Sequence, residues 1–306
     1  MLITQTSLKK LSYSDHQYDN ECDFNPDRIS FTCFSGAIDC LTGLSELHCI
    51  SDLPSEFFYH LSKISHNLHS LNIIIRNGVS KIPNELKELI SLQNNLKDLK
   101  LSASSEGNWT DIIPALTKHS NTLTKLHLNN DYVDDLPYLS ISYGCTKPEY
   151  VMKFLENNGK NLKGFYLEEV DCTLNSSIAK LCPNLKKLSI SFKNSELDTL
   201  RIIFNSCQYL ESIKVNCGIY WLKEKEVLET ITKYSPKTFC ELKICHYSDS
   251  ELLPEDLESF FINWKNRPSF TLIINKNYGC INLEVENMKI IKKYKNLDII
   301  KKFEAI

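Results

Sequence analysis

The sequence lacks several features that would place a protein in a class at once. Its 12 cysteines contain no C-x-x-C pair, and its opening, MLITQTSLKK, has no apolar segment of the kind found in signal peptides. No apolar run approaches the length of a membrane span. These absences favour a protein of the reducing cytoplasm or nucleus, with mostly buried free thiols, over a disulfide-bonded secreted protein or a membrane protein.

Excess positive charge and catalytic motifs are missing as well. Among the 306 residues, Lys and Arg number 35 against 38 Asp and Glu, which gives a net charge of -3. A protein that binds DNA or RNA usually carries a basic footprint, so we expect no nucleic-acid partner. There is no G-x-S-x-G, P-loop, H-E-x-x-H or dinucleotide-binding fingerprint, and the eight histidines are dispersed. We therefore predict a protein that is not an enzyme and needs no cofactor or metal.

What the sequence does contain is a repeat. An apolar residue is followed by two variable positions, a second apolar residue, one variable position and a third apolar residue. Most steps between successive copies fall within the period of about 20–29 residues that is typical of leucine-rich repeats. Good copies begin at Leu68, Leu96, Leu123, Leu162, Leu185, Leu210 and Phe239, weaker copies begin at Leu8 and Leu44, and a degraded copy contains Leu272 and Ile274.

The spacing of the repeat predicts the fold. The last two apolar positions alternate with polar ones, as in a strand with one buried face. No single unit can bury its apolar face alone, so stacked units must build the core. We predict an α/β leucine-rich-repeat solenoid, an arc with a parallel sheet on its concave face and helices on its convex face. About ten units should span residues 1–275, followed by a C-terminal helical capping segment over 276–306.

The stretches between the predicted strands are expected to be helices. Residues 54–65, 195–207 and 254–264 carry apolar side chains at helical spacing. Pro54, Pro83 and Pro254, each followed by acidic residues, are typical of helix starts. In six copies of the repeat, a small residue lies three positions before the first apolar residue, which predicts that the preceding helix ends there in a tight turn. These small residues are Ser65, Ser120, Gly159, Cys182, Cys207 and Pro236. The two cysteines there are interpreted as packing residues, with metal ligation as the alternative.

The segments LCPNLKKLSI and SCQYLESIKV resemble the cysteine-containing repeats of F-box/leucine-rich-repeat proteins of the fungal type. In that family the F-box docks onto the adaptor of a ubiquitin ligase, and the repeats hold the substrate. This sequence starts within a repeat and shows no recognisable F-box before it. Residues 53–56, 82–85 and 253–256 echo the opening of an F-box, but each falls at a predicted helix start. The resemblance thus implies substrate recognition, with an adaptor as partner only if an F-box lies upstream.

The outward positions of the predicted strands are the candidate partner-binding residues, since concave faces of solenoids suit protein recognition. The central column consists of Asn72, Lys100, His127, Tyr166, Ser189, Lys214 and Lys243, preceded by Ser12 and His48. A flanking column consists of Ser70, Asp98, Lys125, Gly164, Lys187, Ser212 and Glu241. The alternative is that these positions are merely solvated. A repeat-only scaffold unconnected with ubiquitination is the alternative function.

Two segments leave further alternatives open. The long insertion over 131–147 could join the partner site, and its Asp131, Asp134 and Asp135 form either a solvated acidic turn or a divalent-cation site. Residues 283–303 have helix-like apolar spacing and many lysines. We interpret them as a capping helix with a solvated basic face, although a basic helix can also mark a membrane surface or a nuclear signal.

Overall fold

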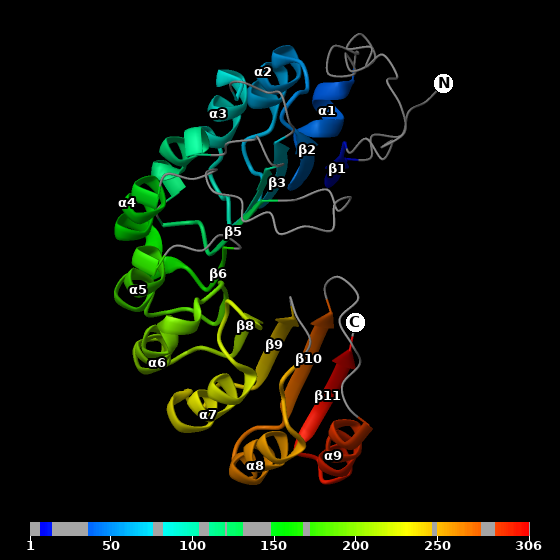
Figure 1. The fold of residues 1–306 in the computed structure, drawn as a ribbon. Coiled ribbons are helices and arrows are strands. Elements are labelled where there is room, and N and C mark those ends of the chain that lie inside the picture. Colours follow the sequence, from blue (N-terminus) through cyan, green and yellow to red (C-terminus); the bar gives the residue numbers. More distant parts are fainter. Residues whose placement is uncertain are drawn as a thin grey trace. The chain divides into compact units, whose positions relative to one another are not determined.

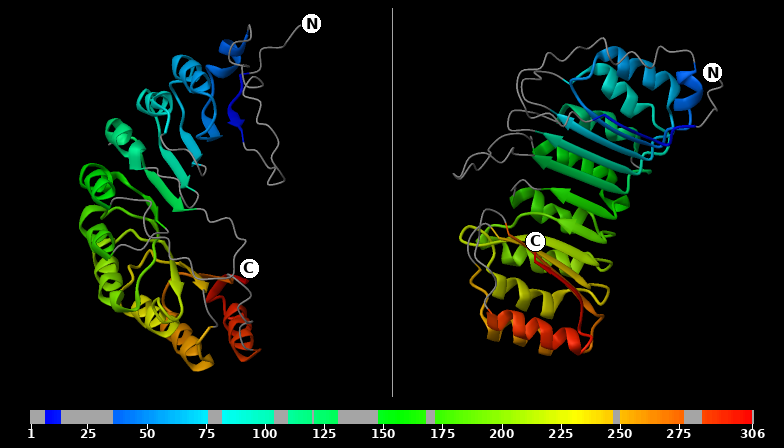
Figure 2. Two further views of the ribbon diagram at one scale, coloured as in Figure 1. Left: turned by 45° about the horizontal axis from the view of Figure 1, so that its top comes forward. Right: turned by 90° about the vertical axis from the view of Figure 1, so that its right-hand side faces the viewer.

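The computed structural model describes residues 7–13, 36–75, 82–103, 110–119, 121–130, 148–167, 172–246, 250–276 and 285–305. The chain divides into two compact units, Met1–Asn161 and Leu162–Ile306. In each unit parallel strands lie side by side, and the helices stack in chain order along one side of them (Figures 1 and 2). The predicted α/β leucine-rich-repeat architecture is therefore confirmed.

The described part of the first unit has the strand order β1-β2-β3-β4-β5, and every neighbouring pair is parallel. Its strands are β1 (Lys10–Ser12), β2 (Glu46–Ile50), β3 (Ser70–Ile75), β4 (Asp98–Ala103) and β5 (Lys125–Asn130). Its helices are α1 (Ala37–Leu41), α2 (Ser55–Ile64), α3 (Asn84–Ser91), α4 (Pro148–Asn158) and the 3-10 helices η2 (Thr110–His119) and η3 (Gly159–Asn161).

The described part of the second unit has the strand order β6-β7-β8-β9-β10-β11. Its strands are β6 (Gly164–Leu167), β7 (Lys187–Ser189), β8 (Ser212–Cys217), β9 (Glu241–His246), β10 (Phe270–Lys276) and β11 (Ile300–Ala305). Its helices are α5 (Cys172–Leu181), the 3-10 helix η4 (Asn194–Glu196), α6 (Leu197–Ser206), α7 (Glu224–Tyr234), α8 (Pro254–Trp264) and α9 (Val285–Asn296).

The apolar slots of the repeat form the core of each unit. In β3, Leu71, Ile73 and Ile75 are buried, while the intervening Asn72 and Ile74 are only half-buried. Each of the three apolar residues in every good copy of the repeat is at most 2% exposed. This alternation follows from the strand period of two, which sends successive side chains to opposite faces of the sheet. The repeat is thus a stack of layers, each closing the core of its neighbour.

A recurring pair of backbone hydrogen bonds joins successive layers just before strands β2 to β5 and β7 to β9. The carbonyl of Lys97 accepts hydrogen bonds from the N–H groups of Thr124 and Lys125, both at 2.9 Å. The same paired arrangement recurs at the carbonyls of Lys9, Ser45, His69, Lys163, Lys186 and Glu211. Because one carbonyl holds two successive N–H groups, the next strand cannot slip along its neighbour, and equivalent positions come into line.

The predicted helices begin and end close to where the sequence places them. Pro54 and Pro83 precede the first residues of α2 and α3, and Pro254 is the first residue of α8. At the helix ends, Ser65, Cys182 and Cys207 are fully buried, as expected for small packing residues, while Ser120 lies outside the described residues. Within the described ranges, no helix is both long and apolar enough to span a bilayer.

The C-terminal segment contains a strand as well as a helix. The spacing of apolar residues predicts one helix over 283–303, but α9 ends at Asn296 and Asp298 adopts a φ of 56°. The chain then forms β11, which pairs in parallel with β10. Tyr294 of α9 stacks on Phe261 of α8, with ring centroids 5.0 Å apart. The segment therefore adds one more helix and strand to the stack.

Candidate binding surface on the outward sheet positions

In the first unit, the candidate residues of the central column stand side by side. Asn72 of β3 is aligned with Lys100 of β4, which is aligned with His127 of β5. His48 of β2 continues the row next to Asn72. All four are half-buried, so their backbones belong to the sheet while part of each side chain reaches the surface. The sequence pattern correctly predicted this grouping; binding by these residues stays a prediction.

The second unit holds the other candidates in a second row. Tyr166 of β6, Ser189 of β7, Lys214 of β8 and Lys243 of β9 are aligned in that order. Ser189 is only 6% exposed, so its side chain is covered by its neighbours and little of it reaches the surface. The other three are half-buried and offer part of their side chains to a partner. Ser189 is therefore the member least suited to direct contact.

Asp98 lies close to two basic side chains on the neighbouring strand of the first unit. Its carboxylate lies 3.4 Å from Lys125 Nζ and 3.8 Å from His127 Nε2. Burial lowers the pKa of His127; Asp98 opposes this shift, whereas Lys100 and Lys125 add to it. The net result is a pKa below the usual 6.5, so His127 is mainly neutral at physiological pH and can act there as a hydrogen-bonding group.

In the second unit, Glu241 is the acidic residue that contacts a lysine of the row. Its Oε1 accepts a hydrogen bond of 2.6 Å from Ser212 Oγ and lies 3.4 Å from Lys243 Nζ. Burial favours a raised pKa for Glu241, but the Ser212 hydrogen bond and the charges of Lys243 and Lys187 outweigh it, and the pKa is lowered. Glu241 is thus ionised at physiological pH and holds the ammonium group of Lys243 in place.

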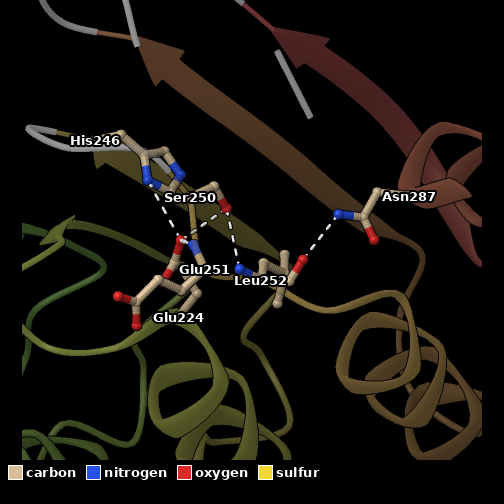
Figure 3. Close-up of polar contacts among 6 residues, drawn as sticks. All are labelled: Glu224, His246, Ser250, Glu251, Leu252 and Asn287. Carbon is tan, nitrogen blue, oxygen red and sulfur yellow. Dashed lines mark hydrogen bonds and ion pairs between the residues drawn. The ribbon is translucent and has the colours of Figure 1, made fainter. Parts of the chain in front are cut away.

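A buried polar cluster lies beyond the carboxyl end of β9 (Figure 3). Glu224 Oε1 accepts hydrogen bonds from Ser250 Oγ at 2.8 Å and from the Glu251 N–H at 3.2 Å, and lies 3.4 Å from His246 Nδ1. Asn287 Nδ2 donates to the Leu252 carbonyl at 2.9 Å. Glu224 and His246 are each 3% exposed. These contacts connect the helix starts of successive layers, so we assign the cluster a structural role.

The buried thiols have low reactivity because burial keeps them protonated. Burial raises the pKa of Cys49, Cys182 and Cys207 to about 12 in each case, and Cys207 Sγ lies 3.4 Å from the Cys182 carbonyl, to which it donates. Since the thiolate is the form that reacts and binds metals, these side chains behave as small apolar residues. Within the described residues, no three His, Cys, Asp or Glu side chains are arranged to hold a metal ion.

Two exposed apolar residues were not predicted as part of a surface. Ile219 and Tyr220, in the turn after β8, are 71% and 60% exposed. Gly218 makes this turn possible because its φ of 138° is unfavourable for residues with a side chain. Neither residue belongs to a repeat position, so no periodic signal marks them. The predicted insertion over 131–147, with Asp131, Asp134 and Asp135, lies outside the described residues.

The solved structures that are similar to this chain include the following two. One is the crystal structure of the Rad7 and Elc1 complex in yeast, with a TM-score of 0.60, 15% sequence identity and coverage of 87% of this chain. The present chain spans 65% of the length of that neighbour. The other is the leucine-rich repeat-containing protein LegL7 from Legionella pneumophila, with a TM-score of 0.52 and 15% identity, covering 95% of this chain and 90% of that one.

The sequence matches no family model and no curated protein. At 15% identity, the structural likeness bears on the fold and not on the partner. It agrees with the strand alignment and the burial pattern of the repeats described above. The chain is a leucine-rich-repeat solenoid.

Proposed function

We propose that this chain is a protein-binding module whose partner lies across the outward positions of the parallel strands. The observation that carries the proposal is the alignment of polar and amphipathic residues into continuous rows, Asn72 to His127 in one unit and Tyr166 to Lys243 in the other. Parallel rows on a rigid sheet place many side chains at fixed spacing, which reduces the entropic cost of binding. No enzymatic activity is part of this proposal.

We further propose that the bound protein is a substrate and that the chain acts as a receptor of the F-box/leucine-rich-repeat type, in the cytoplasm or nucleus. The support is the resemblance of its cysteine-containing repeats to that family, together with the likeness to a structure of Rad7 in complex with Elc1. An adaptor of a ubiquitin ligase is the second partner that this role requires. Its contact would be made by an F-box, which we do not recognise in these 306 residues.

Cross-linking mass spectrometry of the purified chain with a captured cellular protein tests the binding proposal. Lysine-reactive cross-links should join the partner to Lys100, Lys214 and Lys243 on the strands. The matched controls are Lys225 on α7 and Lys292 on α9, which should cross-link less. Cross-links confined to the helix lysines would overturn the assignment of the surface, even if capture itself succeeds.

The ubiquitin link needs a separate test. The chain, and the product of any longer transcript, would be assayed for binding to purified ligase adaptor. Adaptor binding, combined with accumulation of the captured protein when the gene is deleted, supports the receptor role. If neither product binds adaptor, or if the captured protein is turned over normally in the deletion strain, the chain is a scaffold without a ubiquitin function.

A further inference from the structure

The outward side of the second unit's sheet carries more positive than negative charge, although the whole chain has a net charge of -3. The lysines at the strands and strand entries there are Lys163, Lys186, Lys187, Lys214, Lys243, Lys301 and Lys302. The acidic residues at equivalent positions are Glu211, Glu241 and Glu304. The excess of lysine is not visible in the composition, because it is offset elsewhere in the chain.

Each glutamate of this surface is already engaged by a lysine. Lys186 Nζ lies 2.7 Å from Glu211, and Lys302 Nζ lies 2.7 Å from Glu304. Glu241 is paired with Lys243, as described above. By contrast, Lys163, Lys187 and Lys301 are exposed and form no ion pair with any residue in the described ranges. The positive charge is therefore available to another molecule.

The positive groups are close enough to act together. Lys187, at the start of β7, and Lys301, on β11, both act electrostatically on the thiol of Cys240, which precedes the intervening strand β9. Lys214 and Lys243 are direct neighbours in the sheet. Lysines spread over several adjacent strands in this way produce a continuous field, which attracts an oppositely charged partner and steers its approach.

The helices α6 to α8 of the same unit have the opposite balance. Acidic residues outnumber basic ones on them: Asp198, Glu224, Glu226, Glu229, Glu255, Asp256 and Glu258 against Arg201, Lys225 and Lys233. Helices α5 and α9 are exceptions, because α5 carries Lys180 and no acidic residue, and α9 carries Lys289, Lys292, Lys293 and Lys295 against Glu286. The lysine excess of the sheet side therefore contrasts with the acidic excess of helices α6, α7 and α8. The first unit repeats the sorting on its own strands, where lysines again outnumber acids.

We infer that the partner presents an acidic polypeptide segment to the outward sheet surface of the second unit. This inference rests on the proposed function and specifies the partner's chemistry. Tyr166 and the aliphatic stems of the lysines supply apolar contact, and the ammonium groups pair with Asp or Glu of the partner. A polypeptide suits this surface better than a nucleic acid because Glu211, Glu241 and Glu304 interrupt the positive rows, and a phosphate backbone with a charge at every nucleotide would meet them.

The test uses fluorescein-labelled peptides of equal length and equal apolar content that are rich in Glu and Asp, in Ser and Gln, or in Lys. Fluorescence anisotropy with the full chain should show binding of the acidic peptide and at least about tenfold weaker binding of the other two, with a loss of affinity as salt rises. A single-stranded oligonucleotide serves as the competing polyanion and should not displace the acidic peptide at matched charge.

Charge-reversal variants locate the site. The Lys187→Glu/Lys214→Glu variant should bind the acidic peptide about tenfold more weakly, and the milder Lys187→Gln/Lys214→Gln variant should lose part of that affinity. The control, Lys292→Glu/Lys295→Glu on α9, changes net charge by the same amount and should bind normally. Circular dichroism checks that each variant is folded.

The possible results separate this inference from the proposed function. Equal binding of acidic and neutral peptides, equal losses in the sheet and α9 variants, or displacement by the oligonucleotide would each overturn the acidic-segment inference. If the captured cellular protein still cross-links to Lys214 and Lys243 in that case, the proposed binding function stands with a partner of different chemistry. Cross-links confined to the helices would instead overturn the proposed binding surface on the strands.

Discussion

Cys182 and Cys207 occupy equivalent positions at the ends of α5 and α6, where the chain turns from a helix into the next strand. The N–H group of each donates to the carbonyl four residues earlier, at 2.8 Å in both cases. The side chain at this point faces the neighbouring layer and must be small. A cysteine fits because it is small and apolar, and burial keeps it protonated.

These thiols should resist alkylation in the folded protein. With a pKa of about 12, the thiolate fraction is on the order of one in ten thousand at about pH 8, and burial blocks access as well. Iodoacetamide labelling followed by peptide mass spectrometry should modify the exposed Cys172 but leave Cys182 and Cys207 unmodified until the protein is denatured. Equal labelling of all three in native buffer would contradict the packing role.

Glu224 is a buried acidic residue whose contribution to the free energy of unfolding can be measured. Replacing it with alanine removes the acceptor for Ser250 Oγ and the Glu251 N–H and leaves these part-buried donors without that partner. We expect Glu224→Ala to lower the free energy of unfolding by about 2–4 kcal/mol. Glu229→Ala on the exposed side of the same helix is the control and should change stability little. Urea unfolding followed by circular dichroism measures both, and coincident transitions would argue against the network.

At the scale of elements, side chains after the ends of α3 and α8 connect successive layers. Gln93, after α3, accepts a hydrogen bond from the Leu68 N–H at 2.9 Å and donates to the carbonyls of Ser65 and Leu89. Arg267, after α8, donates to the Ser235 carbonyl at 2.9 Å and lies over the ring of Trp264. These side chains satisfy carbonyls that the helices leave without partners at their C-terminal ends.

The Gln93 contacts should make a measurable contribution to stability. Gln93→Ala leaves the Leu68 N–H without its acceptor and the Ser65 carbonyl without that donor, at a cost of about 2–3 kcal/mol. Asn94→Ala, at the neighbouring exposed position, should cost far less. Thermal unfolding of the two variants provides the comparison. Identical melting temperatures would mean that the connection between these layers depends on the backbone alone.

At the scale of the molecule, the important property is that each layer contacts mainly the layers next to it in the sequence. Strand neighbours are always consecutive within a unit, and the helices stack in the same order. Stability in such a structure is approximately a sum over layers and their interfaces. A local defect should therefore weaken its own neighbourhood and leave distant layers intact.

The Tyr294→Ala variant tests this expectation. It removes a ring that is fully buried and stacked on Phe261, at a cost of about 3–5 kcal/mol to the last layers. Hydrogen exchange followed by mass spectrometry should show reduced protection in β10 and β11 and unchanged protection in β2, β3 and β4. Loss of protection throughout the chain would indicate cooperative unfolding of all layers.

Most of the fold could be predicted from the sequence because the repeat is a local pattern. The spacing of Leu68, Leu71 and Ile73 specifies which side chains face the core, and the prolines mark where the helices begin. The rows of outward residues follow from the same spacing, since equivalent positions of identical layers must come into line. Alignment with neighbouring strands therefore required no knowledge of distant contacts.

The rest depended on tertiary contacts. The predicted helix-like apolar spacing continues to residue 303, yet α9 ends at Asn296 and β11 begins at Ile300, because β10 offers backbone groups with which a new strand can pair. Ser189 looks like its neighbours in the repeat but is covered in the folded unit. The contact between Glu224 and Ser250 joins residues far apart in the sequence. Such contacts arise only when the layers stack, because no local pattern records which side chain will meet which.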